Sequence, residues 1–315
     1  MESAASSRPT SAPEDTGRPD TPSIQGVETD IPKWPRLARI RSSLACPACL
    51  SDLTCTPNSL TCGQCAASYP LRDGKIYFIQ PPPSNDHLDR FKRRLKRLFG
   101  RRYYSIGVQL VAPTYPFNYS EAIRNHCEPA AQLIVDLGSG NNRVDDNIIT
   151  LDSVDYESVD IVADLGALPF KSESIDGFAS RSVLEHVSRL DSAVKEIGRC
   201  TRSGGIGIHL IPFLFPYHAS PHDYQRLTHV GAATLFPGWR LLEQRNVTGP
   251  VTLLAACLTE FLAILLSFGR PRLKSIAYLA ACLLLFPLKF LDAPFVGRRA
   301  FLSLAPTILT VVQKP

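Results

Sequence analysis

The pattern of apolar and polar positions changes along the chain, and it is most regular after Ala131. There, short apolar runs of the kind found in buried strands alternate with helical patterns. The expected strands cover 132–137, 147–152, 160–163, 175–180, 205–212 and 239–247. Between the fourth and fifth runs, apolar residues recur at helical spacing from Leu190 to Ile197, and we expect this helix to stop at Gly204-Gly205. Strands interleaved with helices predict a doubly wound α/β fold with a parallel sheet.

After the sixth run the chain becomes strongly apolar. Val251–Phe268 carries one charge, Glu260, and Ser275–Leu288 is a second apolar run; the basic stretch GRPRLK separates them. Both runs are short for a membrane span, so the sequence predicts a helical hairpin that dips into or lies on a membrane leaflet. The alternative is a soluble helical subdomain buried in a dimer. Thr307–Gln313 is β-branched and predicts a last strand that returns to the sheet.

The N-terminal third has a different organisation. Its first residues are rich in Ser, Thr, Pro, Asp and Glu, without the apolar segment of a signal peptide, so we expect a disordered tail. A cysteine-rich module follows, and after PPPSN a basic amphipathic helix is expected. The predicted boundaries are 1–40 for the tail, 41–80 for the module, 86–104 for the basic helix, 115–247 for the α/β domain, 248–300 for the apolar insertion and 301–315 for the last strand.

Composition says little about the class of protein. With 44% hydrophobic and 20% charged residues the chain is an ordinary globular protein, and a net charge of +5 does not by itself require nucleic acid as a partner. The 9 cysteines are not spaced like a disulfide framework. We therefore expect reduced thiols in a cytoplasmic protein, with the paired cysteines holding a metal.

Two Cys-x-x-Cys pairs supply four thiolates. Cys46 and Cys49 form one pair, and Cys62 and Cys65 form the other. Each pair can direct both sulfurs at one tetrahedral ion, so the spacing predicts a structural Zn²⁺ in a zinc-ribbon module. With four thiolates there is no open position for catalysis. The alternative is four buried free cysteines in a small hydrophobic module.

A Gly-x-Gly turn follows the first strand of the α/β region. Asp136, Gly138, Ser139 and Gly140 form this turn. Asp152 ends the second strand, where a carboxylate can accept both hydroxyls of a ribose, and Asp164-Leu165 follows the third, suited to an adenine. A nicotinamide site would need a third glycine, but Arg143 stands in its place. Each acid alone could instead cap a turn.

These segments resemble a known family. VDLGSGN, LDSVDY, VADLGALPF, SIDGFASRSVLEHV, EIGRCTRSGG and IHLIPF, in this order, are similar to S-adenosylmethionine-dependent methyltransferases of class I, of the ubiquinone/menaquinone-biosynthesis type. The resemblance covers about 133–247 and implies a Rossmann-like, seven-stranded sheet that binds S-adenosyl-L-methionine. It implies Asp136, Gly138, Gly140, Asp152, Asp164 and Leu165 as cofactor contacts, with Ser180 and Arg181 beside the methionine end. One departure is the short segment after Gly140, which curtails the usual first helix.

The N-terminal module has its own resemblance. Its cysteine pairs followed by YPLRDGKIYFI are similar to a zinc-ribbon family that includes an activator subunit of tRNA and protein methyltransferases.

The stretch PFLFPYHASPHDYQRLT follows the fifth strand and concentrates polar residues over the expected pocket. Similar bacterial methyltransferases carry a related stretch. We expect His218 or His222 to act as a base and Arg226, next to Asp223, to anchor the substrate. These residues could equally order the loop by hydrogen bonds. His186 is expected to be structural and His209 to lie in the core.

Together these features predict a cytoplasmic methyltransferase, peripheral on a membrane. It would transfer a methyl group by in-line displacement to an oxygen or nitrogen of a lipid-linked or amphipathic small molecule. Two alternatives stay open: methylation of RNA or protein with the zinc ribbon as docking surface, and a scaffold that binds the cofactor without turnover.

Overall fold

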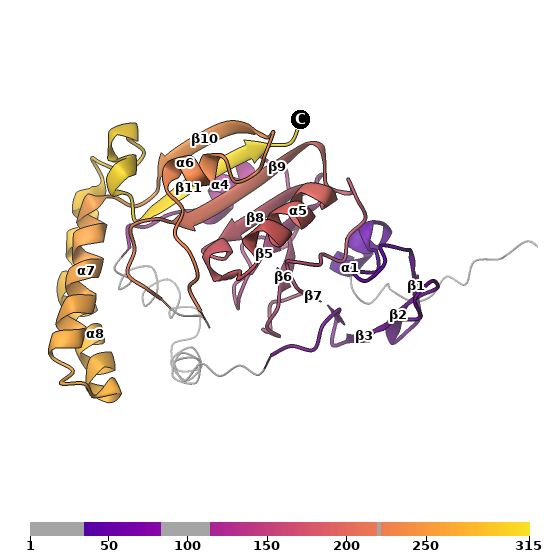
Figure 1. Ribbon diagram of the computed structural model, residues 1–315, viewed down its shortest axis with the longest axis horizontal. Helices are drawn as coiled ribbons and strands as arrows, with labels where there is room; N and C mark the ends of the chain where they lie inside the picture. The colour runs from indigo at the N-terminus through magenta and orange to yellow at the C-terminus, as the bar shows by residue number, and fades with distance from the viewer. Residues whose placement is uncertain (1–34, 83–113, 219–221) are drawn as a thin grey trace, which may run out of the picture.

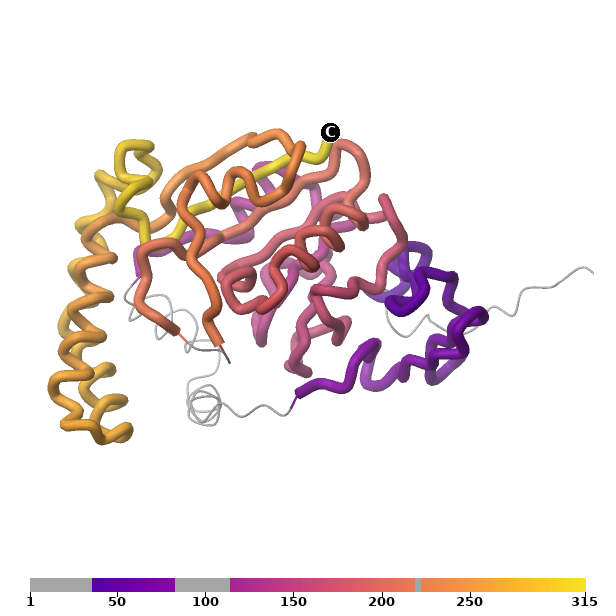
Figure 2. Tube along the Cα trace, viewed as in Figure 1, coloured from indigo at the N-terminus to yellow at the C-terminus, as the bar shows by residue number. Residues whose placement is uncertain are grey.

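The computed structural model describes residues 35–82, 114–218 and 222–315. The predicted basic helix at 86–104 and most of the predicted tail lie outside these residues. Figure 1 and Figure 2 place the N-terminal module at one end of the molecule and two long helices, α7 and α8, at the opposite end. A sheet connects the two ends.

Seven strands of this sheet come from the α/β region. Their order is β7-β6-β5-β8-β9-β11-β10. The first five are parallel, and β11 pairs antiparallel with both β9 and β10, so it runs against its two neighbours. The strands are β5 (Ile134–Leu137), β6 (Ile149–Asp152), β7 (Ile161–Val162), β8 (Ile175–Arg181), β9 (Thr201–Pro212), β10 (Arg240–Asn246) and β11 (Thr307–Gln313). Every residue of β5 and β6 is buried, as expected for parallel strands that are covered on both faces.

The predicted seven strands are nevertheless too few, because the sheet has 11 strands. The module contributes β1 (Leu53–Cys55), β2 (Ser59–Cys62), β3 (Ser68–Arg72) and β4 (Lys75–Tyr77). β4 pairs in parallel with β7, so the module extends the sheet. The pairing covers an edge that would otherwise leave backbone groups unpaired. The side chains of Lys75 and Tyr77 in β4 both donate hydrogen bonds to the Asp155 carboxylate.

The start of the described chain corrects the tail prediction. Residues Pro35–Ile40 form helix α1, followed by a short 3-10 turn at Arg41–Ser43. Leu37 and Ile40 of this helix belong to the main hydrophobic core. The predicted disordered segment 1–40 is therefore wrong for its last six residues, which the described structure packs against the sheet.

The helix before β9 ends earlier than predicted. α5 runs from Leu190 to Cys200, and its buried face consists of Ala193, Val194, Ile197 and Cys200. The chain then enters β9 at once, and Gly204 takes a left-handed φ of +76°. The two glycines thus form a bulge inside β9 rather than a helix stop, since the pairing register with β8 shifts between Ile175 and Gly177.

Two short helices complete the α/β region. α4 (Tyr119–Arg124) begins at Asn118, whose side chain caps it, and α6 (His229–Ala233) begins at Thr228 in the same way.

The apolar insertion forms two long helices that pack side by side, α7 (Pro250–Leu265) and α8 (Pro271–Leu285), as Figure 1 shows. The 3-10 segments Phe286–Asp292 and Arg299–Leu304 return the chain to β11. Small residues make up the buried face of α7, namely Thr252, Ala255, Ala256, Thr259 and Ala263. The outer surface carries large apolar side chains, including Leu254, Phe261, Ile276 and Leu284. By length and composition, Pro271–Asp292 is one segment apolar enough to cross a membrane.

One buried carboxylate fixes the base of this helix pair. Asp292 is fully buried and accepts hydrogen bonds from the backbone N–H groups of Gly249, Val251 and Thr252 at the start of α7. A Cβ on Gly249 would lie 2.4 Å from the nearer carboxylate oxygen, so only glycine leaves room for it. The carboxylate therefore holds the entry of α7 against the exit from α8.

Removing this carboxylate should loosen the helix pair. We expect Asp292→Ala to lower the free energy of unfolding by about 2–4 kcal/mol, because three buried N–H groups lose their acceptor. Urea unfolding followed by circular dichroism measures the change. Asp191→Ala, which removes an exposed carboxylate from the first turn of α5, is the matched control. Equal effects of the two substitutions would contradict this role of Asp292.

Candidate functional site

The site is built around the turn that follows β5. Gly138 and Gly140 both have left-handed backbone conformations, with φ of +60° and +59°. A Cβ on Gly138 would lie 2.5 Å from a methyl of Val183, so this turn lies directly against the segment after β8. In the described structure no helix separates β5 from β6, in agreement with the curtailed spacing after Gly140.

A half-buried arginine, Arg143, holds this turn where the usual first helix is absent. The guanidinium of Arg143 binds both carboxylate oxygens of Asp160 at 2.8 and 3.0 Å, and it also donates to the carbonyl of Ser158 at 2.6 Å. Thr150 of β6 donates to the same carboxylate. The residue that stands where a nicotinamide fingerprint has its third glycine is thus a structural anchor that joins the turn to β6 and β7.

The acids at the ends of β6 and β7 lie where the sequence predicts them. Asp152 is almost fully buried, and its two oxygens accept from the N–H groups of Gly140 and Val154, each at 2.9 Å. Burial raises the pKa of this carboxyl. Asp164 is exposed and caps a tight turn through the N–H of Gly166, and the neighbouring Leu165 is buried. Both acids bond to turns, and both stand at the carboxyl ends of parallel strands.

Asp136 has a partner that the sequence analysis missed. Its carboxylate is buried in β5 and accepts a hydrogen bond from the hydroxyl of Tyr119 at 2.9 Å. Burial raises the pKa of Asp136 to about 7, although the Tyr119 hydrogen bond and the charge of Arg181 oppose this shift. Near neutral pH the carboxyl is therefore poised between its charged and neutral forms.

The predicted pair at the end of β8 separates in the structure. Arg181 is exposed at the strand end. Ser180 is fully buried, and its hydroxyl bonds to Nδ1 of His209 at 2.9 Å. His209 is buried and stacks on Phe236, and burial lowers its pKa to about 3. The prediction of a core histidine is confirmed, and the predicted cofactor contact of Ser180 stays a prediction.

The loop after β9 is ordered by an ion pair. Both terminal nitrogens of Arg226 bind the Asp223 carboxylate, and the N–H of His218 donates to the same carboxylate at 3.1 Å. Burial opposes ionisation of Asp223, but the hydrogen bonds from Arg226 hold its pKa below the usual range. The guanidinium predicted to anchor a substrate is thus engaged within the loop.

This loop folds back onto the segment after β8. Glu185 lies in the 3-10 turn Leu184–His186 and has a side chain that is 1% exposed. Its Oε1 is 3.6 Å from Nε2 of His186 and 3.5 Å from Nε2 of His218. His222 has an exposed side chain, and its backbone carbonyl bonds to Nδ1 of His186 at 2.6 Å. The loop therefore brings His218, but not the His222 ring, to a buried carboxylate.

The sequence analysis missed Glu185 as a functional residue. It noted only its neighbour His186, as a structural residue. One signal in the sequence could have indicated Glu185. It is a carboxylate directly after the apolar Leu184 and before the expected helix, where burial of an unpaired charge would be costly.

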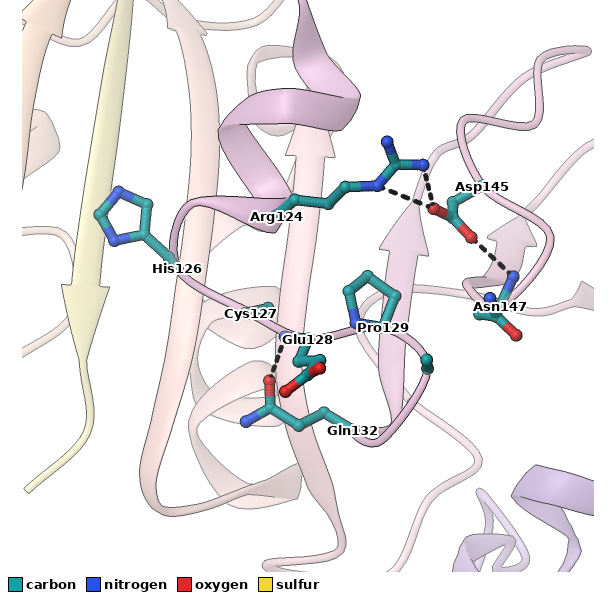
Figure 3. Close-up of a pocket in the computed structure, with 9 residues that line it drawn as sticks. Arg124, His126, Cys127, Glu128, Pro129, Gln132, Asp145 and Asn147 are labelled. Atoms are coloured by element: carbon teal, nitrogen blue, oxygen red, sulfur yellow. Dashed lines mark hydrogen bonds and ion pairs between the residues drawn. The ribbon is translucent and has the colours of Figure 1, made fainter.

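A cavity also lies away from this region. It has a volume of about 770 Å³ and lies before the start of β5, lined by residues that include Arg124, His126, Glu128 and Asp145. Figure 3 shows the Arg124 side chain bonded to Asp145 across this cavity. The cavity is at the amino end of β5, so it is separate from the acids at the carboxyl ends.

The four paired cysteines come together in the module. Their sulfurs all lie within 4.8 Å of one another. The two pairs have matching turns, because Leu50 N–H bonds to the Cys46 carbonyl and Ala66 N–H bonds to the Cys62 carbonyl. Leu50 and Ala66 also share a left-handed φ, of 61° and 58°. Two equivalent knuckles that direct four sulfurs at one point are compatible with a tetrahedral zinc ion.

Comparison with known proteins finds a family match within the α/β region. Residues 135–208 match the family described as "Methyltransferase domain". This segment runs from β5 to β9 and contains the glycine turn, the acids and Glu185. No curated protein sequence matches the chain.

Several solved structures are similar to the chain. A complex of the Haloferax volcanii Trm112 methyltransferase activator with a methyltransferase is 16% identical, covers 73% of this chain and 99% of that one, and has a TM-score of 0.36. Phosphoethanolamine N-methyltransferase 2 of Haemonchus contortus is 15% identical over 73% of this chain and 59% of that one, with a TM-score of 0.44. A Thermotoga maritima protein described as a possible histamine N-methyltransferase is 17% identical over 50% and 83%, with a TM-score of 0.37. Scores this low carry no argument about function.

The buried carboxyl of Asp136 should make stability depend on pH. Its folded pKa is raised, so the stabilisation is present below the unfolded pKa near 4 and is lost as pH rises through about 7. Relative to Asp136→Asn, the wild-type chain should therefore lose about 2–3 kcal/mol of unfolding free energy between pH 5 and pH 7.5. Urea denaturation at both pH values measures this difference. A difference that does not change with pH would contradict the raised pKa.

Proposed function

We propose that this class I S-adenosylmethionine-dependent methyltransferase works at the cytoplasmic face of a membrane. It transfers a methyl group to an oxygen or nitrogen of a lipid-linked or amphipathic small molecule. The observation that carries the proposal is the α7–α8 pair, a long apolar projection inserted between two strands of the methyltransferase sheet.

The packing of this pair is typical of helices in lipid. The buried face of α7 consists of alanines and threonines, while Leu254, Phe261 and Phe268 are 69%, 59% and 82% exposed. A helix pair in water would place its large apolar residues inside. Helices in a bilayer instead pack through small residues, because lipid already solvates the large ones. With 16 residues α7 is about 24 Å long, shorter than the hydrocarbon core, so the pair enters one leaflet or lies along it.

The base of the projection contacts the loop that follows β9. The N–H groups of Phe213 and Leu214 bond to the carbonyls of Pro306 and Ala305, between the projection and β11. Phe213 also packs against Leu302 and Ile308. A membrane-bound projection would thereby place the loop that carries His218 and Asp223 close to the lipid surface, where an amphipathic acceptor is available.

The cofactor side of the site would use the carboxyl ends of β5 to β8. We assign the glycine turn of Gly138, Ser139 and Gly140, with Asp136, Asp152, Asp164, Leu165 and Arg181, to S-adenosyl-L-methionine. The cofactor supplies the methyl group as a sulfonium. The residues of this chain bind and orient it, and their carboxylates complement its positive charge.

The module would hold a structural zinc ion through Cys46, Cys49, Cys62 and Cys65. Ser51 donates hydrogen bonds that lower the pKa of the Cys49 thiol to about 6, which favours the thiolate that a metal requires. The module resembles methyltransferase activators, and its strand β4 pairs with β7. Both features favour a role in stabilising the methyltransferase sheet. An RNA or protein acceptor docked on this module is the second candidate function, favoured only by that resemblance.

Binding to vesicles tests the membrane proposal. The full chain should sediment with vesicles of phosphatidylcholine and phosphatidylglycerol, and the double substitution Phe261→Glu with Leu284→Glu should reduce the bound fraction at least ten-fold, since each charge must leave water. Ser172→Glu with Ser203→Glu adds the same charge at exposed serines on the sheet side and is the control. Salt-dependent RNA binding without vesicle binding would instead support the second candidate. A stable dimer of the wild-type chain, disrupted by the same two glutamates, would reveal a dimer interface.

Calorimetry tests the cofactor assignment. S-adenosylmethionine and S-adenosylhomocysteine should bind at micromolar concentration, with NADH as the negative control. Asp152→Ala should weaken both at least ten-fold, because the Gly140 turn loses its acceptor and the ribose loses a carboxylate. Asp146→Ala removes a carboxylate that is 94% exposed and should leave affinity unchanged. Full affinity in Asp152→Ala would overturn the assignment.

A further inference from the structure

We propose that Glu185, His186 and His218 bind a divalent transition-metal ion beside the cofactor turn, and that this ion receives the oxygen to be methylated. The inference rests on the methyltransferase activity of the proposed function and names the acceptor atom. It does not depend on membrane binding.

The first observation is the unsatisfied carboxylate. Glu185 is buried, and no donor among the described residues forms a hydrogen bond with either of its oxygens. A buried carboxylate without a hydrogen bond is costly unless a cation or a proton compensates it. The nearest groups are the two imidazole nitrogens, both beyond hydrogen-bond range.

The second observation is the spacing of these groups. Metal bonds of about 2.0–2.1 Å in tetrahedral geometry separate neighbouring ligand atoms by about 3.4 Å. Oε1 of Glu185 is 3.6 Å from Nε2 of His186 and 3.5 Å from Nε2 of His218. These distances are too long for hydrogen bonds and suit three ligands around one ion. Two histidines and one carboxylate form a common set for Zn²⁺ and other first-row cations.

The third observation is the orientation of the two rings. Nδ1 of His186 lies 2.6 Å from the carbonyl of His222, and a carbonyl only accepts, so this nitrogen carries the proton and leaves Nε2 free. Nδ1 of His218 lies 3.5 Å from a carboxylate oxygen of Asp223. The Arg226 guanidinium donates a hydrogen bond to this Nδ1 at 3.3 Å, and both its terminal nitrogens hold the Asp223 carboxylate. Metal binding at Nε2 requires the His218 ring to carry its proton on Nδ1 and to donate it to Asp223 in place of the Arg226 contact, and a carboxylate acceptor behind the ring is typical of metal-binding histidines.

The site has an open side. His218 has a side chain that is 36% exposed, and three protein ligands leave at least one position for another molecule. Val183, two residues before Glu185, touches the glycine turn, so the open side and the cofactor turn belong to one region. We therefore place the acceptor between them.

This position defines the role of the ion. A hydroxyl of the acceptor bound to the cation has a lowered pKa and loses its proton to the solvent. The oxygen then attacks the methyl carbon of the sulfonium. The carbon–oxygen bond forms as the carbon–sulfur bond breaks, and that electron pair stays on sulfur, which leaves S-adenosylhomocysteine and the methyl ether or ester. An alcohol gains most from such an ion, because its hydroxyl has a far higher pKa than an ammonium group, so the site favours an oxygen acceptor.

Cobalt binding tests the site without requiring an acceptor. The full chain is first given one equivalent of Zn²⁺, which the softer cysteine cluster takes up, and is then titrated with Co²⁺. We expect one further equivalent with visible d–d bands and no thiolate-to-cobalt band in the near ultraviolet. Glu185→Gln and His218→Ala should each weaken cobalt binding at least ten-fold, and Asp223→Asn should weaken it about ten-fold through the His218 ring.

Glu157→Gln removes an exposed carboxylate and should bind cobalt like the wild-type chain. Circular dichroism of each variant checks that the fold is kept, and His218→Ala keeps the test valid if Glu185→Gln unfolds. No cobalt uptake by the wild-type chain, uptake only with a thiolate band, or equal uptake by folded Glu185→Gln would each overturn the proposal. Vesicle sedimentation and cofactor calorimetry are independent of these outcomes, so failure of the metal site and failure of the proposed function are distinguishable.

Discussion

The carboxylate of Asp160 connects three parts of the molecule that the chain order keeps apart. It binds Arg143 from the glycine turn, Thr150 from β6 and, at 3.5 Å, Arg36 from the N-terminal helix α1. A buried charge of this kind needs its partners, and losing one leaves the others uncompensated. The turn, the central strands and helix α1 are therefore positioned by one ionic group.

The turn after β5 and the loop after β9, which form the two halves of the site, are joined by one short segment. On one side, Gly138 has no Cβ and so admits Val183; on the other, Tyr224 N–H bonds to the backbone carbonyl of Glu185. The segment from Val183 to Glu185 thus contacts both the turn after β5 and the loop after β9. A movement of this short segment would therefore displace both the turn after β5 and the loop after β9. The same segment carries the buried Glu185 carboxylate, whose two oxygens accept no hydrogen bond from the described residues.

The sequence predicted the elements whose pattern is local. The central strands of the α/β region were found within a few residues because they are continuous buried runs, such as Ile134–Leu137. The acids at the strand ends were placed correctly for the same reason. The joining of β4 to β7 was not predicted, because a three-residue strand has no readable period and its partner lies far along the chain. The Glu185 cluster escaped as well, since it depends on a loop that returns from β9, and Arg143 was read as a missing glycine rather than as an anchor.

The position of β11 has a consequence for the order in which the molecule forms. β11 is the last strand in the chain, yet it lies between β9 and β10, and β10 pairs with no other described strand. The sheet therefore cannot close on this side until β11 has been synthesised. The apolar helices α7 and α8 precede β11 in the chain, and Asp292 ties their ends together in the folded structure. Until β11 pairs, the chain presents an apolar projection on an incomplete sheet, and such a state is prone to aggregation. Early capture of the projection by a lipid surface would protect the chain during biogenesis as well as locate the finished enzyme.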